Sequence, residues 1–297
     1  MSTPKAATTG TFDGVHLGHR LVVDTVIRTA DELGLEPAVI TFDRHPLMTI
    51  APHRAPLRIM SPEREREELE RLGVSVIVLP FTEELRRLTA RQWMERMARD
   101  FDVRALVVGY DNTFGCDGTE MDTAAYRALG EATGIDVREA PMLPGVSSTA
   151  IRHALAEGDV ARAAAMLGRP FELTGTVAHG DALGRTIGRP TANITPPAGM
   201  LVPATGTYAA LASLPGENAT ERPALLNIGR RPTVGGESLR IEAHILDYSG
   251  DLYDKQLTVN LIARLRDERR FDSIAALGAQ IDSDEARTRA ILDRVRR

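Results

Sequence analysis

Residues 10–19 read Gly-Thr-Phe-Asp-Gly-Val-His-Leu-Gly-His, and this stretch decides the fold of the first half of the chain. It follows a short run, Ala6–Thr9, that can form a strand, and it leads into an amphipathic segment from about His19 to Leu33. A strand that passes through a glycine-bearing turn into a helix is typical of an α/β fold. His16 and His19 lie three residues apart at the helix start, so their imidazoles point the same way. Free N–H groups at that start favour an anion, and the stretch therefore predicts a phosphate site.

The sequence beyond this stretch continues to alternate apolar runs with helical patterns. We expect strands at Pro37–Phe42, Val74–Leu79 and Val103–Val108, and helices from Ser61-Pro62 to Gly73 and over Ala90–Phe101. Uninterrupted apolar strands separated by helices predict a parallel sheet that is covered on both faces, a doubly wound α/β domain. Trp93 is expected to be a packing anchor of its helix, and the charges of Glu63–Glu70 to form a solvated helix face with ion pairs within the helix.

The second half of the chain has a different pattern. Two short helices are expected at Ser148–Ala156 and Val160–Leu167, and Gly168–Pro170 then breaks the pattern. Short β runs follow, separated by Gly- and Pro-rich turns, at Phe171–Ala178, Gly206–Ala212, Ala224–Ile228, Leu239–Leu246 and Gln256–Ile262. Such spacing predicts a small antiparallel barrel, with a terminal helix after Ser273. The predicted domains are residues 1–168 and 171–297.

Composition limits the classes of partner. The 297 residues suffice for two domains, and 43% hydrophobic with 26% charged residues is ordinary for a soluble globular protein. The net charge of −5, with acids and bases mixed, argues against nucleic acid as the main partner. The single cysteine, Cys116, and the lack of a long apolar run predict a cytoplasmic protein without membrane contact. We expect a monomer or a weak homo-oligomer.

The stretch Ser147-Ser148-Thr149-Ala150-Ile151-Arg152 is a second candidate phosphate site. It offers three hydroxyls at a helix start and a guanidinium one turn later, which can bind the β- and γ-phosphates of a nucleotide and hold departing pyrophosphate. A simple N-cap is the alternative. For the histidine pair, stabilisation of charge on an α-phosphate competes with a pair of surface or metal-binding histidines.

Residues 180–193 read Gly-Asp-Ala-Leu-Gly-Arg-Thr-Ile-Gly-Arg-Pro-Thr-Ala-Asn. The three glycines, Gly180, Gly184 and Gly188, suit a backbone cradle for phosphates. Thr191 and Asn193 share one face of an extended segment, and their neutral oxygens can help hold Mg²⁺. On composition alone, a plain hairpin is equally compatible with these residues.

Together these motifs resemble a known family. The HxGH and SSTxIR motifs resemble the nucleotidylyltransferase superfamily, and further matches narrow the first half to the adenylyltransferase module of bacterial bifunctional FAD synthetases. These matches are Gly10–His19, Thr41–Pro46, Leu79–Phe81 and Val108–Gly115. The GRTxGxPTAN pattern resembles the signature of the flavokinase module. It is accompanied by Asn227–Thr233, Ile241–Tyr248 and Arg266–Phe271.

The resemblance implies a Rossmann-like nucleotidylyltransferase domain joined to a flavokinase-like barrel. It implies phosphorylation of riboflavin to FMN and adenylylation of FMN to FAD, with ATP as substrate of both reactions, Mg²⁺ as cofactor and pyrophosphate released. For adenylyl transfer it implies His16, His19 and Arg152 as catalytic residues, Phe12, Gly14, Gly109, Asp111, Ser147, Ser148 and Thr149 at ATP, and His45 and Pro46 at the flavin. For the kinase it implies Gly180, Gly184, Gly188, Thr191 and Asn193 at ATP, the last two also at the metal.

Glu242 is the candidate base of the kinase. In Leu239–Leu246 apolar residues alternate with Arg240, Glu242 and His244, so Glu242 leaves the apolar face and can reach a cleft. It matches the family glutamate that takes the proton of the riboflavin 5′-hydroxyl. A solvated strand carboxylate is the alternative.

The sequence departs from the family at three positions. Arg44 replaces a usual proline, Arg189 an aromatic or aliphatic residue, and Asp254 a glycine. These departures leave open a riboflavin kinase without the second activity, an enzyme for a flavin analogue, and a non-catalytic flavin- or nucleotide-binding protein.

Overall fold

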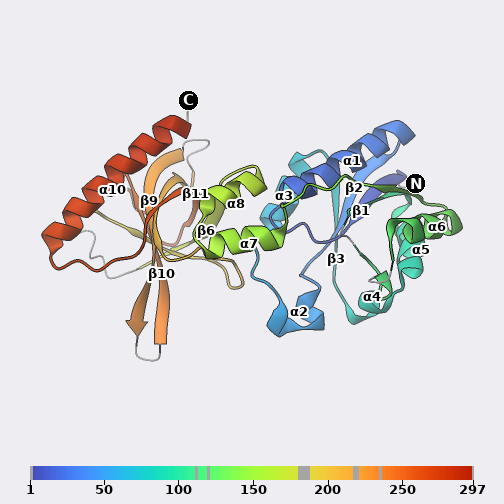
Figure 1. The fold of residues 1–297 in the computed structure, drawn as a ribbon, viewed down its shortest axis with the longest axis horizontal. Coiled ribbons are helices and arrows are strands. Elements are labelled where there is room, and N and C mark those ends of the chain that lie inside the picture. The colour runs from blue at the N-terminus through green and yellow to red at the C-terminus, as the bar shows by residue number, and fades with distance from the viewer. Residues whose placement is uncertain are drawn as a thin grey trace. The chain divides into compact units, whose positions relative to one another are not determined.

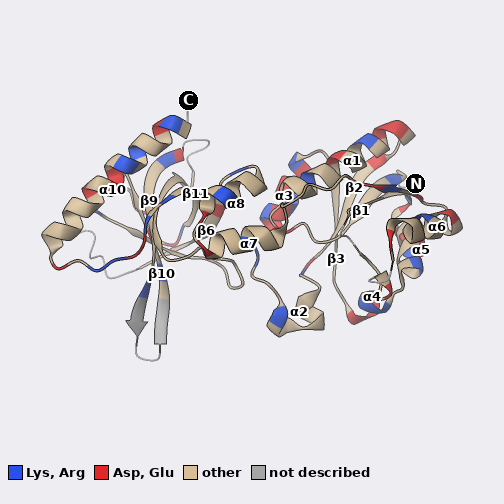
Figure 2. Ribbon diagram, viewed as in Figure 1, with Lys and Arg blue, Asp and Glu red and all other residues tan. Residues whose placement is uncertain are grey.

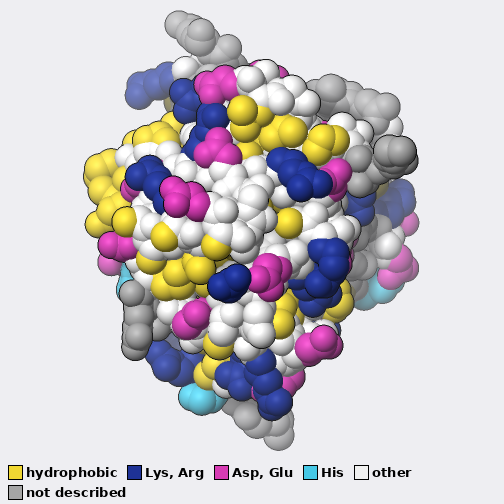
Figure 3. Space-filling model, turned by 90° about the vertical axis from the view of Figure 1, so that its right-hand side faces the viewer, with side chains coloured by type: hydrophobic (Ala, Val, Ile, Leu, Met, Phe, Trp, Pro, Cys, Tyr) yellow, Lys and Arg dark blue, Asp and Glu magenta, His cyan; other side chains and the backbone are white. Residues whose placement is uncertain are grey.

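The computed structural model describes residues 3–110, 113–118, 121–179, 188–216, 221–233 and 236–295 (Figure 1). By its contacts the chain divides into two compact units, Met1–Ser148 and Thr149–Arg297. No helix in these described ranges is long and apolar enough to cross a membrane. Acidic and basic side chains are interspersed along the helices (Figure 2) and on the face drawn in Figure 3.

The first unit is built on a five-stranded parallel sheet in the order β3-β2-β1-β4-β5. The strands are β1 (Lys5–Thr9), β2 (Glu36–Phe42), β3 (Ser75–Leu79), β4 (Val103–Val108) and β5 (Asp136–Glu139). The predicted doubly wound α/β domain is thereby confirmed. The sequence analysis missed β5, because its residues Asp-Val-Arg-Glu form no apolar run and it lies at the edge of the sheet.

The helices of the first unit connect its strands. They are α1 (Leu17–Leu33), α2 (Leu47–Ile50), α3 (Pro62–Arg71), α4 (Glu83–Arg87), α5 (Ala90–Phe101) and α6 (Thr123–Thr133), with a 3₁₀ turn η1 at Pro52–Arg54. α1 and α3 pack on the face that carries Val39, whereas α5 and α6 pack on the opposite face with Ile40. Local signals set the bounds of α5, since Thr89 and Gln92 form a capping box at its start.

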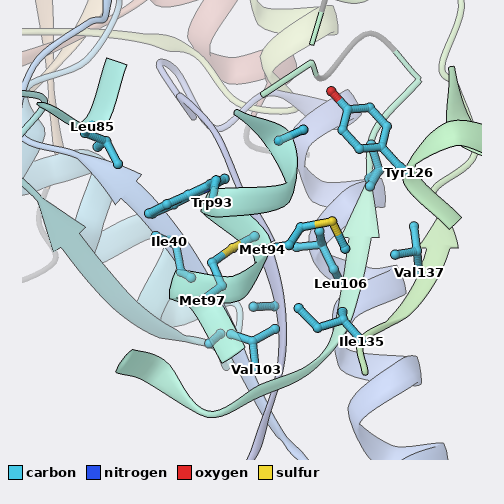
Figure 4. Close-up of a cluster of buried hydrophobic side chains, with 14 residues drawn as sticks. Ile40, Leu85, Trp93, Met94, Met97, Val103, Leu106, Tyr126, Ile135 and Val137 are labelled. Carbon is cyan, nitrogen blue, oxygen red and sulfur yellow. The ribbon is translucent and has the colours of Figure 1, made fainter. Parts of the chain in front are cut away.

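Trp93, Met94 and Met97 point from α5 toward Ile40 and Leu106 of the sheet (Figure 4). The Trp93 side chain is buried, as expected for a packing anchor. These large side chains fix α5 against the sheet, and they thereby position the segments that follow the carboxyl ends of the strands.

The second unit is a closed barrel with the strand order β10-β7-β6-β11-β8-β9, in which neighbouring strands are antiparallel. The strands are β6 (Phe171–Ala178), β7 (Ala192–Thr195), β8 (Gly206–Ser213), β9 (Glu221–Thr233), β10 (Gly236–Ile245) and β11 (Gln256–Arg266). Helix α10 (Ile274–Val295) lies along the outside of the barrel (Figure 1). The predicted small antiparallel barrel with a terminal helix is confirmed.

Helices α7 (Ser148–Ala156) and α8 (Val160–Leu167) have the bounds that the sequence predicts. α8 packs on β6 and β11, and the Ala204 N–H donates to the Leu155 carbonyl at 2.9 Å. By contacts, nearly all of these helices therefore belong with the barrel. The boundary at residues 168–171 stays a prediction about where the two functional modules separate.

Asp254, which stands where the family has glycine, has a left-handed backbone with φ of 61°. Its N–H donates to the Val177 carbonyl at 2.9 Å, which ties this turn to β6. Glycine adopts this conformation without strain, and aspartate tolerates it better than most residues.

We predict that Asp254→Ala lowers the free energy of unfolding by about 0.5–1 kcal/mol, because alanine is more strained in a left-handed conformation. Asp254→Gly should be at least as stable as the wild type. Urea unfolding measures both variants, with Asp293→Ala on α10 as the control for loss of an exposed carboxylate. Equal stability of the glycine and alanine variants at position 254 would contradict the explanation.

Candidate active sites

The turn between β1 and α1 has a backbone that few sequences can adopt. Gly14 has a φ of 87°, and a Cβ atom there would lie 3.1 Å from Ile59 Cγ2. Val15 follows with a φ of 39° and donates its N–H to the Phe12 carbonyl at 2.8 Å. The turn therefore needs glycine at position 14, and it brings the next residue, His16, to the N-cap of α1.

His16 and His19 lie face to face at this helix start. Their ring centroids are 3.6 Å apart, and His16 Nδ1 accepts the His19 N–H at 3.2 Å. A Cβ atom on Gly18 would lie 3.2 Å from the His16 ring, so glycine makes room for the stacked pair. Phe12 covers the other side, with its ring centroid 5.0 Å from that of His19.

Burial lowers the pKa of His19 well below its usual value, and the nearby His16 lowers it further. His19 is therefore neutral at pH 7. Its Nδ1 is buried and has no hydrogen-bond partner in the described part of the chain. A protonated ring would need partners for both N–H groups, so this environment disfavours the cation.

Asp13 connects the turn to two other segments. Its buried carboxylate accepts the N–H groups of Ile59 and Met60 at 3.0 and 3.1 Å. Its carbonyl accepts the hydroxyl of Ser148 at 3.0 Å. The SSTxIR segment is thereby fixed to the histidine turn at Ser148. Ser147, just before Ser148, is half-buried and belongs to the first unit. Thr149 and Arg152 lie further along α7 and belong to the second unit.

A cavity of about 410 Å³ lies at the carboxyl ends of β1 and β2. Aromatic residues contribute much of its wall. The rings of Phe42 and Phe81 meet edge to face, with their centroids 5.2 Å apart. Pro46 lines this cavity, as does the edge of the packing anchor Trp93. Sequence reasoning assigned no role to Phe42 and Phe81. The available signal was their position at the carboxyl end of β2 and two residues after β3.

The other expected residues of this unit are placed as follows. His45 lies beside a small hollow next to this cavity, and its Nδ1 accepts the Leu47 N–H at 3.1 Å. Gly109 is buried directly after β4. Asp111 lies outside the described residues. Arg44 pairs with the adjacent Asp43 at 3.1 Å in place of the family proline.

Glu65 on α3 is a buried carboxylate, contrary to the solvated face predicted for Glu63–Glu70. It pairs with Arg58 at 2.7 Å and accepts the Thr41 hydroxyl at 3.4 Å. Burial raises the pKa of Glu65 to about 7, Arg58 opposes that shift, and Asp13 adds to it. Glu68 of the same helix is buried as well. The prediction failed for these two residues because a helix with so many charges gives no sequence signal for the ones that turn inward. Ion pairs within the helix, such as Arg66–Glu70 at 2.7 Å, do form on the exposed side.

In the barrel, Glu242 lies in a polar row across neighbouring strands. It stands directly opposite Asn193 of β7 on one side and Asn227 of β9 on the other. Residues so paired have Cβ atoms about 4.5–5.5 Å apart. Thr207 of β8 extends the row, since its hydroxyl lies 3.4 Å from the Asn227 side-chain oxygen.

The alternation that assigned Glu242 to a cleft is present in the structure. Ile241, Ala243 and Ile245 are buried, whereas the Glu242 side chain is 25% exposed and lies 3.4 Å from the Arg240 guanidinium. A carboxylate so largely shielded is not the freely solvated strand residue of the alternative interpretation. Leu239 differs from the pattern, since it is exposed.

A second cavity, of about 340 Å³, lies on the other face of β10, where Ala243 and Ile245 line it. Pro190, Thr191 and Ala192 form one wall and the segment 248–253 another. Gly188 has the left-handed φ of 70° that favours glycine, whereas Gly180 and Gly184 lie outside the described residues. His179 stacks on Tyr253 at 3.9 Å next to the cavity.

Neither site offers a cage of metal-binding side chains. Within the described ranges, no group of three or more His, Cys, Asp or Glu residues could hold an ion. The neutral oxygens of Thr191 and Asn193 suit Mg²⁺, which keeps most of its ligands as water and substrate phosphate.

These two folds define a class of protein: a two-domain transferase, with a Rossmann-like nucleotidylyltransferase unit followed by a flavokinase-type barrel. Comparison with known proteins specifies it further. Residues 1–152 match the FAD synthetase family model and residues 167–292 the riboflavin kinase model. The bifunctional riboflavin kinase/FMN adenylyltransferase of Pseudomonas fluorescens is 38% identical, with 96% of this chain and 92% of that protein aligned. Its counterpart from Bacillus subtilis is 35% identical, with 93% and 89% aligned.

The chain belongs to the bifunctional riboflavin kinase/FMN adenylyltransferase family. It phosphorylates riboflavin to FMN and adenylylates FMN to FAD, with ATP as the substrate of both reactions. A crystal structure described as a macrolide-efflux protein from Streptococcus pneumoniae shares the fold, with a TM-score of 0.89, 30% identity, and 97% of this chain and 95% of that chain covered. The activity of this chain follows from its family models and sequence relatives.

The raised pKa of Glu65 predicts that the stability of the fold depends on pH. Folded Glu65 holds its proton up to about pH 7, whereas the unfolded chain releases it near pH 4.5. Its contribution to stability is therefore fully present below pH 4.5 and is lost as the pH rises to about 7. The loss is at most about 3.5 kcal/mol, since the pKa rises from 4.5 to about 7 and each pKa unit is worth about 1.4 kcal/mol.

We predict that Glu65→Gln removes this dependence. The difference in unfolding free energy between variant and wild type, from urea titrations between about pH 4.5 and 7.5, should shift in favour of the variant as pH rises. Glu70→Gln, on the exposed side of α3, is the control and should show a constant difference. A constant difference for Glu65→Gln as well would mean that the carboxyl titrates normally.

Proposed function

We propose that Glu242 is the base of the riboflavin kinase reaction. Its carboxylate takes the proton of the riboflavin 5′-hydroxyl as that oxygen forms a bond to the γ-phosphorus of ATP. The bond from the γ-phosphorus to the bridging oxygen breaks, and ADP leaves with the electron pair. The observation that carries this assignment is the row Asn193–Glu242–Asn227, in which a shielded carboxylate stands opposite two neutral amides on neighbouring strands.

The segment 188–193 would hold ATP and the metal of this reaction. Thr191 lines the cavity, Asn193 faces Glu242, and Gly188, Gly184 and Gly180 contribute backbone N–H groups to the phosphates by resemblance to the family. Mg²⁺, when bound through Thr191 and Asn193, would neutralise charge on the transferred phosphate.

For adenylyl transfer, we propose that an FMN phosphate oxygen attacks the α-phosphorus of ATP. A bond forms there, the bond to the oxygen of the β-phosphate breaks, and pyrophosphate leaves. His16 and His19, together with the N-terminus of α1, donate hydrogen bonds to the developing charge. Because the His19 pKa is lowered, this ring acts as a neutral donor rather than as a cation.

The substrates of this reaction would bind around the same turn. Phe12, Gly14, Gly109 and Asp111 would surround ATP, and Ser147, Ser148, Thr149 and Arg152 would hold the departing pyrophosphate. The flavin ring suits the aromatic cavity between Phe42, Phe81 and Pro46, with His45 at its edge.

The alternative functions fit less well. A kinase without the second activity has no use for the stacked histidines and the aromatic cavity, and a non-catalytic binder has no use for a carboxylate placed as Glu242 is. We further propose that the enzyme acts in the cytoplasm as a monomer or a weak homo-oligomer, with small molecules and not nucleic acid or membrane as partners. The exposed free thiol of Cys116 supports a reducing compartment.

We predict that chromatography of products will separate the two sites. With riboflavin, ATP and Mg²⁺, His16→Ala should accumulate FMN, with FAD formation slowed at least about 100-fold. Glu242→Gln should slow FMN formation by at least about 100-fold, yet convert supplied FMN to FAD normally.

His153→Ala, on an exposed face of α7, and Glu221→Gln, at the start of β9, are the matched controls, and both should make FAD at the wild-type rate. If Glu242→Gln still makes FMN at more than a tenth of the wild-type rate, Glu242 is not the base. If His16→Ala makes FAD normally, the histidine turn is not the adenylyl-transfer site.

A further inference from the structure

Arg189 puts a charge in the kinase signature where an aromatic or aliphatic residue is common, and the structure shows what this charge contacts. Its Nε lies 3.1 Å from Glu285 Oε1, and its guanidinium forms a second ion pair with Asp282. Both acids lie on α10, the C-terminal helix. The signature segment is therefore held from outside the barrel, by residues about 95 positions further along the chain.

His244 joins the same cluster from β10. One ring nitrogen, Nδ1, lies 2.8 Å from the Pro190 carbonyl oxygen, and the other, Nε2, lies 3.4 Å from Glu285 Oε1. The Glu285 carboxylate thus stands between Arg189 and His244, and its side chain is only 16% exposed. Ion pairs in such a shielded place are screened less than those on an open surface.

This cluster fixes Arg189 and Pro190, which precede the first paired residue of β7. Pairing of β7 with β10 begins at Ala192, and Pro190 has no N–H to donate to a neighbouring strand. Arg189 and Pro190 therefore enter the barrel ahead of the regular ladder, immediately before Thr191. Their contacts with α10 and His244 fix the direction in which Thr191 and Asn193 approach Glu242.

Other polar side chains of α10 bind the barrel and hold the helix in place. Asp284, which is buried, pairs with Arg266 of β11 at 2.9 Å, and the Arg287 guanidinium donates to the Leu265 carbonyl at 2.9 Å. A displacement of α10 would break these contacts together, so the helix is a stable support for Arg189.

We propose that Arg189 is a positioning residue of the kinase site, acting through Glu285, Asp282 and His244, and that the C-terminal helix is thereby a structural part of the ATP site. The inference rests on the proposed roles of Thr191 and Asn193. It does not require Arg189 to touch substrate. Loss of the cluster leaves Glu242 in place but loosens the segment that binds the nucleotide.

The test compares Arg189→Gln with Arg289→Gln. Arg289 also joins α10 to the barrel, through Asp247 at 2.8 Å, but that contact is with the end of β10 and not with the signature. We expect Arg189→Gln to raise the KM for ATP in riboflavin phosphorylation about tenfold, with kcat changed less than threefold, because both ion pairs with α10 are lost. Arg289→Gln should leave both constants unchanged, and adenylylation of supplied FMN should be normal in both variants.

Calorimetric titration with ADP and Mg²⁺ checks the same effect without turnover, so it does not depend on Glu242 being the base. The Kd for ADP should rise about tenfold in Arg189→Gln and stay unchanged in Arg289→Gln. An unchanged Kd in Arg189→Gln would overturn the positioning role. An unchanged Kd in a Thr191→Ala, Asn193→Ala double variant would instead refute the proposed nucleotide site.

Variants of the acids distinguish positioning from direct phosphate binding. If Arg189 positions the segment, Asp282→Asn combined with Glu285→Gln should raise the KM for ATP as Arg189→Gln does, and the triple variant should be no worse than either. If Arg189 instead binds a phosphate, releasing it from the acids should leave the KM unchanged or lower it. The KM for ATP could instead rise equally in Arg189→Gln and Arg289→Gln, in step with a lower midpoint of unfolding. The cluster would then only stabilise the fold, and the positioning role would be refuted.

Discussion

The proposed α/β site depends on the hydrogen bonds that Asp13 accepts at its buried carboxylate and at its carbonyl. Asp13 lies in a turn where the next two residues have positive φ, a conformation that a free chain would rarely populate. Two backbone N–H groups from the segment 59–60 offset the cost of burying its charge, and Ser148 binds its carbonyl. The strained turn is thereby held by segments about 45 and 135 residues away. Without them, His16 would not reach the N-cap position.

The barrel site depends instead on strand register. Glu242 faces its two asparagines only while Ile241, Ala243 and Ile245 fill the interior, because a slip by one residue would exchange the two faces of β10. The apolar side chains thus place the carboxylate that they do not touch. His244 lies on the same face two residues further on, which explains how a contact with Pro190 and α10 can be transmitted to the row.

The sequence predicted those elements whose determinants are local. α5 and β4 have the expected bounds because a capping box and an apolar run mark them. The edge strand β5 was missed because it has no apolar run, whereas α6 was missed although Asp122 and Gly134 cap its two ends. Positions set by long-range contacts were beyond reach. Nothing near Glu65 indicates that Arg58 and Thr41 enclose it, and nothing near Arg189 indicates two acids on a distant helix. Asp254 could be recognised as a departure, but its left-handed backbone required the structure.

The two proposed sites differ in the groups that they offer, a carboxylate in one and hydrogen-bond donors in the other. The charge of each nucleophile explains this difference. The riboflavin 5′-hydroxyl is neutral, so its attack on a phosphate needs a base, and a shielded carboxylate stands in the row of the barrel. FMN already carries an ionised phosphate at neutral pH, because the second pKa of a phosphate monoester is about 6. Adenylyl transfer therefore needs no proton acceptor, only donors for the charge that builds on the α-phosphate. In keeping with this, Asp13 accepts backbone N–H groups and Glu65 pairs with Arg58. In the proposed site, the stacked histidines and the start of α1 would supply the donors. The product of the barrel thus carries the ionised group that lets the α/β site work without a base.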